Sequence, residues 1–283
     1  MTDKVSEGFA EVRDIATQFV RARLAGTSLP DFPGRIPATI DLAYGCQNAA
    51  IVAWPDTIQG WKVGRILEPW FSRLGEDRLV GPIFKGGVRF AQTADSSAPL
   101  EIPVFVGGFA AVEAEFIVKL GADAPAHKTQ WKAEEARELV AALHVGIETA
   151  GSPLATINDL GPLVVISDLG NNAGLIVGAE IPNWRSIAPE HLASETWVED
   201  RRVGVGSAAS VPGGPMGGLA FALNRCARRG LPLQAGQWIS TGATTGIHDI
   251  RAGQSAKAVF AGVAEISCRA VPAQPTPSRK AAP

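Results

Sequence analysis

The chain has 283 residues, of which 46% are hydrophobic, 19% charged and 7% aromatic, and its formal net charge at pH 7 is −2. This length and composition allow a large buried core, in one large domain or two small ones, and exclude a disordered or fibrous chain. Lys and Arg form only short groups such as Arg228-Arg229, which argues against nucleic acid as a partner.

The cysteines and the N-terminus indicate the compartment. Cys46, Cys226 and Cys268 form no CxxC pair, and their odd number indicates reduced thiols rather than a disulfide framework. The N-terminal residues lack the apolar run and cleavage site of a secretory signal. No stretch reaches the roughly 18 apolar residues that a transmembrane helix requires. We therefore expect a cytoplasmic protein that does not enter a membrane.

The beginning of the chain is predicted to be helical. Apolar residues recur at three- and four-residue spacings over residues 7–25, which is typical of an amphipathic helix. After several prolines, a second helix is predicted over residues 38–53. Its expected buried face consists of Ile40, Leu42, Ala43, Cys46, Ala49 and Val52. Residues 1–58 are therefore predicted to form a helical N-terminal lobe.

The remainder of the chain is predicted to be rich in strands. Short β-type runs separated by Gly and Pro occur at 60–63, 82–84, 112–120, 163–167, 175–177, 195–198, 238–240, 256–260 and 263–268. Helices are predicted over 133–150 and 216–229. Residues 271–283 are Pro-rich and are predicted to be disordered. The pattern indicates an α+β chain with curled sheet, and the predicted sheet domain spans residues 59–270.

Two carboxylates share one side of a predicted strand. Glu113 and Glu115 alternate with apolar residues, and successive side chains of a strand point to opposite faces. The pattern alone favours a solvated strand face. Neighbouring carboxylates repel each other, however, and a divalent cation with oxygen ligands is the usual way to relieve this repulsion.

Glu148 is the candidate for a third ligand. It lies near the C-terminal end of the helix predicted over 133–150, where a carboxylate opposes the helix macrodipole and requires a compensating charge. Three Glu ligands favour Mg²⁺ or Mn²⁺ over Zn²⁺, because no His or Cys lies at ligand-like spacing. We therefore predict a Mg²⁺ or Mn²⁺ site made by Glu113, Glu115 and Glu148.

Several motifs resemble those of one superfamily. They are Tyr44-Gly45-Cys46-Gln47, Gly60-Trp61-Lys62-Val63-Gly64, Glu113-Ala114-Glu115 with Gly146-Ile147-Glu148, and Gly213-Gly214-Pro215-Met216 followed by Leu231–Gln237 and Ser240-Thr241-Gly242. Together they resemble the Y-x-x-Q, G-x-K-x-G, E-x-E…E/D and G-N-P-x…L-x-A-G-D…T-G motifs of the fumarylacetoacetate hydrolase superfamily, 2-keto-4-pentenoate hydratase branch. The resemblance covers about residues 40–270. It implies a mixed β-roll, like the C-terminal domain of that superfamily, with surrounding helices and a helical N-terminal lobe.

The resemblance also implies catalytic residues. Lys62 is expected to handle a proton or bind the substrate carboxylate, with its pKa lowered by desolvation beside a metal; the alternative is a surface lysine. Asp77 matches the first Asp of the branch's L-G-x-D-x-P-D stretch, whereas Val80 or a gap replaces the second. Asp168 is expected either to support the site or to cap a loop. The missing Asp, and Arg65-Ile66-Leu67-Glu68 in place of the branch's L-T-S, weaken the case for water addition.

Other residues are expected to contact the substrate. Thr241–Gly246 resembles the T-G-T-P-x-G segment of the superfamily's hydrolases, where backbone amides and a hydroxyl bind a carboxylate; the alternative is an ordinary turn. Thr244, Thr245 and His248 are therefore predicted substrate contacts, although a lone histidine is more often structural. Tyr44 and Gln47 of the Y-x-x-Q motif are further predicted contacts.

The resemblance implies a metal-dependent hydratase of aromatic-ring degradation. It would add water to a 2-hydroxy-2,4-dienoate of the 2-keto-4-pentenoate type through an enolate stabilised by the metal. The same enolate also permits 2-oxo acid decarboxylation, dehydration of a 2-keto-3-deoxy acid or acylpyruvate hydrolysis, but no His precedes His127 to serve as a hydrolytic base. A non-catalytic partner subunit is the alternative from another class. The expected substrate is a small 2-oxo or 2-hydroxydienoic acid, and the expected assembly is a homo-oligomer.

Overall fold

A computed structural model of the protein describes residues 2–91 and 99–276, with the backbone alone for residues 2–9. Its helices are α1 (Thr2–Ala25), α2 (Ile40–Ala53), α3 (Trp70–Leu74), α4 (Ala133–Arg137), α5 (Pro162–Ser167) and α6 (Gly214–Arg228). Its strands are β1 (Ile58–Arg65), β2 (Arg78–Phe84), β3 (Val88–Phe90), β4 (Leu100–Val104), β5 (Phe109–Leu120), β6 (Val140–Ser152), β7 (Asn172–Glu180), β8 (Ala193–Val198), β9 (Arg201–Ser207), β10 (Trp238–Ser240), β11 (His248–Asp249), β12 (Ser255–Phe260) and β13 (Ala264–Pro272). No helix in these ranges has the length and hydropathy needed to span a membrane.

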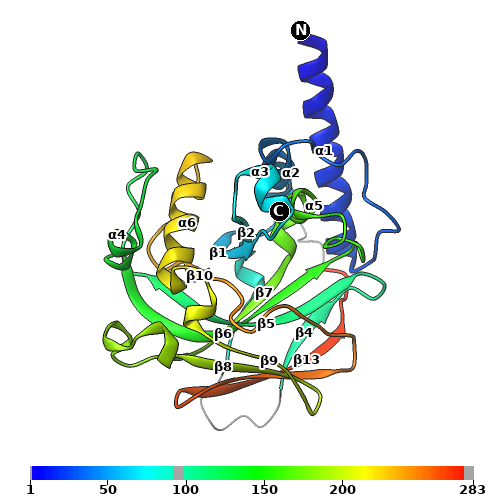
Figure 1. The fold of residues 1–283 in the computed structure, drawn as a ribbon. Helices are drawn as coiled ribbons and strands as arrows, with labels where there is room; N and C mark the ends of the chain where they lie inside the picture. Colours follow the sequence, from blue (N-terminus) through cyan, green and yellow to red (C-terminus); the bar gives the residue numbers. More distant parts are fainter. Residues whose placement is uncertain (1, 92–98, 277–283) are drawn as a thin grey trace, which may run out of the picture.

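Two packed sheets form the centre of the fold (Figure 1). The described strands give a larger sheet of order β2-β1-β10-β5-β6-β7-β3, with β11 paired to β5, and a smaller sheet of order β4-β13-β12-β8-β9. Most pairs are antiparallel, but β1 runs parallel to β10, β3 to β7 and β4 to β13. The helices lie on the side of the larger sheet away from the smaller one (Figure 1). The α+β fold with mixed, curled sheet is therefore as predicted.

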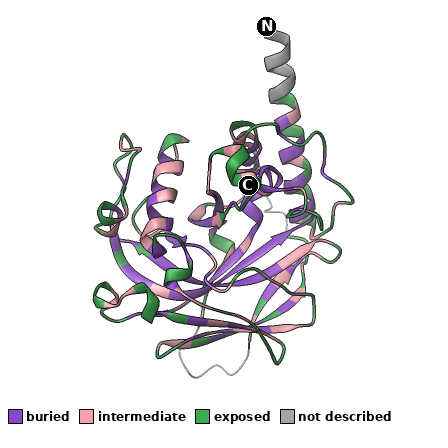
Figure 2. Ribbon diagram, viewed as in Figure 1, coloured by how far each residue is buried: buried purple, intermediate pink, exposed green. Residues whose placement is uncertain are grey.

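The main hydrophobic core lies between the two sheets, and its strands are largely buried (Figure 2). Phe116 of β5 meets Phe260 of β12 edge-to-face, with ring centroids 5.5 Å apart. Val112 and Val118 belong to the same core. Because strand side chains alternate, the other face of β5 is turned away from the smaller sheet and carries Glu113 and Glu115.

A second apolar cluster fixes the N-terminal helices to the rest of the chain. Its buried members come from α1, from α2, from the connection between these helices and from the segment around α5: Val12, Ile15, Phe19, Phe32, Cys46, Leu154, Ile157 and Val164. The inward face of α2 differs from the predicted one, since Leu42 and Val52 are 41% and 87% exposed. Tyr44 and Gln47 are buried in their place. Polar side chains with internal hydrogen-bond partners therefore displace apolar ones from this face.

The prediction of one helix over residues 133–150 is wrong beyond the first turn, because most of this segment forms a strand. Helix α4 ends at Arg137, and β6 then pairs with β5 along its length and with β7 on its other edge. Both faces of β6 are largely buried, so its sequence is almost continuously apolar and has no clear period of two. Such a run cannot be distinguished from a buried helix by periodicity.

Two shorter predictions also fail. Residues 163–167 were predicted to be a strand but form α5, whose first residue, Pro162, suits the start of a helix. Residues 271–276, placed in the predicted disordered tail, are held by backbone hydrogen bonds. Strand β13 reaches Pro272, Ala273 N donates to Val104 O (2.8 Å), and Thr276 N donates to Leu24 O (2.7 Å). The rest of the predicted tail, 277–283, lies outside the described residues.

Candidate metal centre

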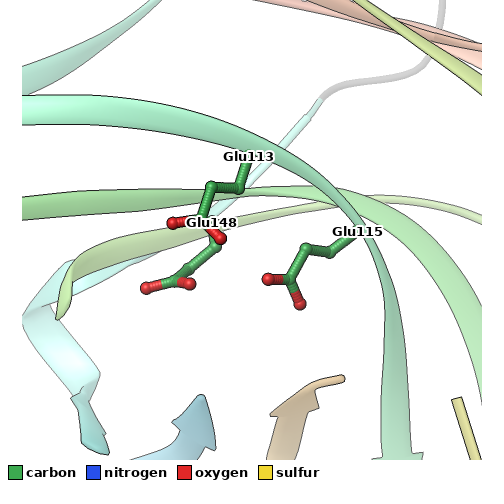
Figure 3. A group of neighbouring side chains, drawn as sticks. All are labelled: Glu113, Glu115 and Glu148. Carbon is green, nitrogen blue, oxygen red and sulfur yellow. The ribbon is translucent and has the colours of Figure 1, made fainter. Parts of the chain in front are cut away.

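Three glutamates meet on neighbouring strands of the larger sheet (Figure 3). Glu113 and Glu115 lie on β5, and Glu148 of β6 is the cross-strand partner of Glu113. Because cross-strand partners point to the same face, the three carboxylates extend to one side of the sheet. All three are buried, and one oxygen from each lies within 4.8 Å of the others. The predicted trio is therefore together, although Glu148 comes from a strand and not from a helix end.

Gly146 gives the trio its close packing. It is the cross-strand partner of Glu115. A Cβ at this position would lie 2.5 Å from Ile117 Cγ1 and 2.6 Å from the carbonyl oxygen of Ile176, which is too close for either neighbour. The glycine therefore allows three adjacent strands to approach where the carboxylates converge.

Hydrogen bonds hold one oxygen of Glu115 and one of Glu148, and the other oxygen of each accepts no hydrogen bond from the described residues. Glu115 Oε2 accepts hydrogen bonds from Ser240 Oγ (2.6 Å) and from Gly242 N (2.7 Å). Glu148 Oε1 accepts one from Asn172 Nδ2 (2.9 Å). Within the described part of the chain, Glu115 Oε1 and Glu148 Oε2 are buried without a hydrogen-bond partner. Such oxygens are costly to bury unless a cation coordinates them.

The glutamate cluster carries more negative charge than its surroundings balance. Burial raises the pKa of Glu113 to about 7; the ammonium of Lys62 lowers this pKa in part, and Glu148 raises it again. Burial, followed by repulsion from Glu148 and Glu113, raises the pKa of Glu115 well above its usual value, although its two hydrogen bonds oppose the change. A divalent cation would supply the missing positive charge.

Lys62 lies on the same face of the sheet. The parallel pairing of β1 with β10 places it beside Ser240, and its Nζ lies 3.1 Å from Glu148 Oε2, an ion pair by distance without the angles of a hydrogen bond. Burial lowers the pKa of Lys62, but the three glutamates outweigh burial and raise this pKa above its usual value. The sequence expectation of a lowered pKa assumed a metal beside Lys62; without a metal, the summed charge of the three carboxylates acts in the opposite direction.

A cavity of about 580 Å³ borders the cluster, and both Lys62 and Glu113 line it. Its wall also includes residues 241–244 and the end of β1, together with Trp70, Asn158 and Asn171. This volume is within the range of small-molecule sites. A small substrate could therefore reach the face on which the carboxylates converge.

Tyr44 and Gln47 were predicted as substrate contacts. Both are buried and make hydrogen bonds inside the protein. Tyr44 Oη accepts a hydrogen bond from Val80 N (3.0 Å), and the guanidinium of Arg229 lies 4.2 Å from the centre of its ring. Gln47 Nε2 donates to Val80 O (2.9 Å) and to Ile166 O (3.0 Å). Neither side chain lines the cavity. The Y-x-x-Q motif thus ties α2 to β2 and α5.

Asp168 does not line the cavity either, but it is connected to the glutamates. It forms a buried ion pair with Arg23 of α1, with 2.5 Å between Nε and Oδ1, and accepts a hydrogen bond from Ser152 Oγ (2.6 Å). Arg23 also donates to the carbonyl oxygen of Asn172 (2.9 Å), the residue whose side chain holds Glu148. Asp168 therefore positions Arg23. Arg23 in turn holds the backbone of Asn172, whose side chain holds Glu148.

One of the substrate contacts predicted in and after the segment Thr241–Gly246 lies at the cavity. Thr244 lines the cavity, although its N and Oγ1 both donate to Ala114 O (3.0 and 2.7 Å). Thr245 Oγ1 is paired with Thr196 Oγ1 (2.7 Å). His248 Nε2 lies 3.0 Å from Thr245 O. Neither Thr245 nor His248 lines the cavity.

Asp77, predicted to be catalytic, lies outside the cavity. Its Oδ2 is 3.4 Å from Nη1 of Arg78, and its side chain is about half exposed. Arg78 itself lines the cavity, as does Arg65, its cross-strand partner. Sequence reasoning noticed Arg65 only as a departure from the L-T-S pattern, and the strand register that pairs the two arginines was not visible.

The supporting residues Ser240, Asn172 and Arg23 were also missed as parts of the site. Ser240 belongs to a motif that we recognised, but its bond to Glu115 follows from the β10–β5 pairing. Asn172 and Arg23 are 24 and 149 positions from the residues that they support. No local signal in the sequence indicates such contacts.

Comparisons with known proteins identify solved structures with a similar fold. No protein-family model matches the sequence, and no curated protein does. A 4-oxalocrotonate decarboxylase from Pseudomonas putida G7, complexed with magnesium and adipate, matches 93% of this chain and 98% of its own, with a TM-score of 0.75 and 19% identity. A fumarylpyruvate hydrolase from Pseudomonas aeruginosa, in complex with Mn²⁺ and pyruvate, matches 75% of this chain and 88% of its own, with a TM-score of 0.53 and 18% identity. The chain therefore shares the fold of these two enzymes, which agrees with the mixed α+β fold that its motifs predicted.

Proposed function

We propose that Glu113, Glu115 and Glu148 hold a Mg²⁺ or Mn²⁺ ion and that the protein acts on a small 2-oxo acid. The observation that carries this proposal is the convergence of three buried carboxylates, two of which keep an oxygen without a hydrogen-bond partner. A donor set of oxygens alone suits these hard cations better than Zn²⁺. The magnesium and Mn²⁺ in the two structures described above support the same choice.

Lys62 and the cavity wall supply the remaining chemistry. A cation held by the glutamates would act as a Lewis acid toward the 2-oxo acid end of the substrate. Without a metal, the three glutamates raise the pKa of Lys62 and keep it positively charged, and a cation held by the same glutamates would lower this pKa. Its ammonium therefore balances negative charge that develops on the substrate and can hold a proton at Nζ for delivery to a carbon atom.

Within this proposal, the sequence motifs favour hydration of a 2-hydroxy-2,4-dienoate. Protonation at the remote end of the diene gives an unsaturated 2-oxo acid, and water then adds to the alkene carbon next to that end. Lys62 lines the cavity and is the residue that we assign to the proton transfer. Asp77, Asp168 and His248 lie outside the cavity, so we assign them no direct contact with the substrate.

Decarboxylation of a vinylogous 2-oxo diacid is the second candidate, and the cavity wall favours it. Among the described residues of the wall, the carboxylates are Glu113 and Glu68 and no histidine is present. Glu68 already accepts hydrogen bonds from Ser72 N (3.1 Å) and Ser72 Oγ (2.8 Å). Loss of CO₂ requires no general base, whereas water addition and acylpyruvate hydrolysis use one. The match to a decarboxylase over 93% of this chain agrees with this candidate.

Product identification tests the proposal and separates the two reactions. The purified protein is incubated in ¹⁸O-water with 2-hydroxypenta-2,4-dienoate, or with 2-oxohex-3-enedioate, in Mg²⁺, in Mn²⁺ and in chelator. Metal-dependent label on the C4 hydroxyl of the product identifies a hydratase, and metal-dependent release of CO₂ from the diacid identifies a decarboxylase. Glu115→Gln should abolish turnover, and the exposed control Glu101→Gln should retain it. Absence of both turnover and C3–H exchange with either metal contradicts the proposal.

A further inference from the structure

One neutral polar side chain in the cavity wall has an unused hydrogen-bond acceptor. Asn171, which directly precedes β7, is 3% exposed and lines the cavity. Its Nδ2 lies 3.4 Å from Asn158 Oδ1, which is long for a hydrogen bond. Its Oδ1 is buried and accepts no hydrogen bond from the part of the chain that is described. A buried amide oxygen without a donor is unfavourable, so a donor on a ligand would stabilise this residue.

The backbone that carries Asn171 has an unusual conformation. Leu169, Gly170 and Asn171 have φ values of 56°, 67° and 63°, so three successive residues lie in the left-handed region. This conformation is unfavourable for leucine, because its Cβ approaches the backbone. Such strain persists only where the surroundings hold it, and it is concentrated at functional sites. The turn therefore indicates a role for the side chain that it places at the cavity.

The same turn packs on β2 beside Lys62. Gly81 of β2 is the cross-strand partner of Lys62, and such partners point to the same face of a sheet. A Cβ at Gly81 would lie 2.2 Å from a backbone oxygen of the turn, so only glycine allows this contact. The next residue, Asn172, holds Glu148 through its side chain. Asn171 thus belongs to the end of the cavity where Lys62 and the glutamates lie.

The chemistry of the open group restricts what it can bind. An ionised carboxylate only accepts hydrogen bonds and cannot pair with the oxygen of Asn171, whereas a hydroxyl both donates and accepts. The last side-chain torsion of asparagine has a broad energy minimum, so either end of the amide can turn toward the cavity. A hydroxyl suits both ends. In the hydration proposed above, the water that adds to the substrate becomes a hydroxyl at C4 of the product.

We infer that Asn171 binds this C4 hydroxyl and makes the site prefer 4-hydroxy-2-oxo acids to 2-oxo acids without the hydroxyl. The inference rests on the proposed function for the 2-oxo end of the molecule. In the forward direction the same contact holds the attacking water, because the water oxygen becomes the hydroxyl oxygen. The amide does not ionise, so Asn171 positions the water and does not act as a base. Decarboxylation places no hydroxyl at C4, so this contact favours hydration.

Binding to the Mn²⁺-loaded protein tests the inference. Isothermal titration compares pyruvate, 2-oxopentanoate and each enantiomer of 4-hydroxy-2-oxopentanoate. One enantiomer should bind about tenfold more tightly than 2-oxopentanoate, because a buried polar group disfavours a ligand that leaves it unpaired. Asn171→Gly should abolish this preference and leave pyruvate binding unchanged, since glycine adopts the same positive φ without strain. The recovered ligand is examined by NMR, and if the 4-hydroxy acid is consumed, the loss should appear as an about tenfold higher KM.

Asn183→Gly is the matched control. Asn183 also has a positive φ, of 54°, but it is exposed and lies outside the cavity. The substitution removes the same side chain from the same backbone conformation. This variant should bind all four ligands as the wild type does.

The outcomes separate this inference from the proposed function. If pyruvate fails to bind the Mn²⁺-loaded wild type, the proposed function and the inference both fall. If pyruvate binds but neither enantiomer binds better than 2-oxopentanoate, the inference is wrong and the proposed action on a 2-oxo acid stands. Equal weakening of all ligands by Asn171→Gly also overturns the inference, because Asn171 then only supports the turn. A hydroxyl preference that survives in Asn171→Gly contradicts it as well, because another residue then makes the contact.

Discussion

Replacement of Glu113 by Gln should stabilise the metal-free protein at alkaline pH while removing its stabilisation by metal. Burial raises the pKa of Glu113 to about 7 from the ordinary value of 4.5. At about 1.4 kcal/mol per pH unit, keeping this carboxylate charged in the folded state costs about 3 kcal/mol. Because the folded-state pKa is the higher one, the cost is absent below pH 4.5, grows between pH 4.5 and 7, and is constant above pH 7. Glutamine has the same shape and no charge.

Scanning calorimetry of the wild type and Glu113→Gln, at pH 5 and pH 8 in chelator and then in excess Mn²⁺, measures this effect. In chelator the variant should unfold roughly 5–10 °C above the wild type at pH 8 and close to it at pH 5. Mn²⁺ should raise the unfolding temperature of the wild type, because it binds the folded state, and should not raise that of the variant. The reasoning is refuted if the variant unfolds below the wild type at pH 8 in chelator, or if Mn²⁺ stabilises both proteins equally.

Three further substitutions test the supporting contacts. Ser240→Ala removes a hydrogen bond to Glu115 and should weaken Mn²⁺ binding by about 10–100-fold in calorimetric titration; unchanged affinity would deny Ser240 a positioning role. Arg23→Met leaves Asp168 as an unpaired buried charge and should cost about 3–5 kcal/mol in urea unfolding, with partial recovery when Asp168→Leu is added. Tyr44→Phe leaves a buried backbone N–H without its acceptor and should cost about 1–3 kcal/mol with an unchanged kcat; a large fall in kcat would place Tyr44 at the substrate after all.

The part of the site that depends on strand alternation could be predicted from the sequence. Glu113 and Glu115 are two positions apart in an apolar run, and this spacing alone places both carboxylates on one face. The fold class followed from short runs divided by Gly and Pro, and from motifs whose order could be compared with a superfamily. These features are local, so they can be identified without knowledge of which strands pair.

The parts that depend on pairing could not be predicted in the same way. Glu148 was selected by its motif and charge, yet its strand looked like a helix because burial on both faces hides the period of two. The charges that act on Lys62 could not be predicted either, since they come from three carboxylates on two other strands. The Arg65–Arg78 neighbourhood is likewise set by the register of β1 and β2, which no spacing in the sequence specifies.

The central claim is that the three glutamates form a divalent-metal site, and titration of Mn²⁺ into chelator-treated protein tests it most directly. Isothermal titration, with Mn²⁺ electron paramagnetic resonance to count free ion, should show one Mn²⁺ bound per chain of the wild type. The same site should be lost in Glu115→Gln and retained in Glu101→Gln, whose side chain is exposed on β4. Absence of stoichiometric Mn²⁺ and Mg²⁺ binding to the wild type, or equal binding to Glu115→Gln, would contradict the account.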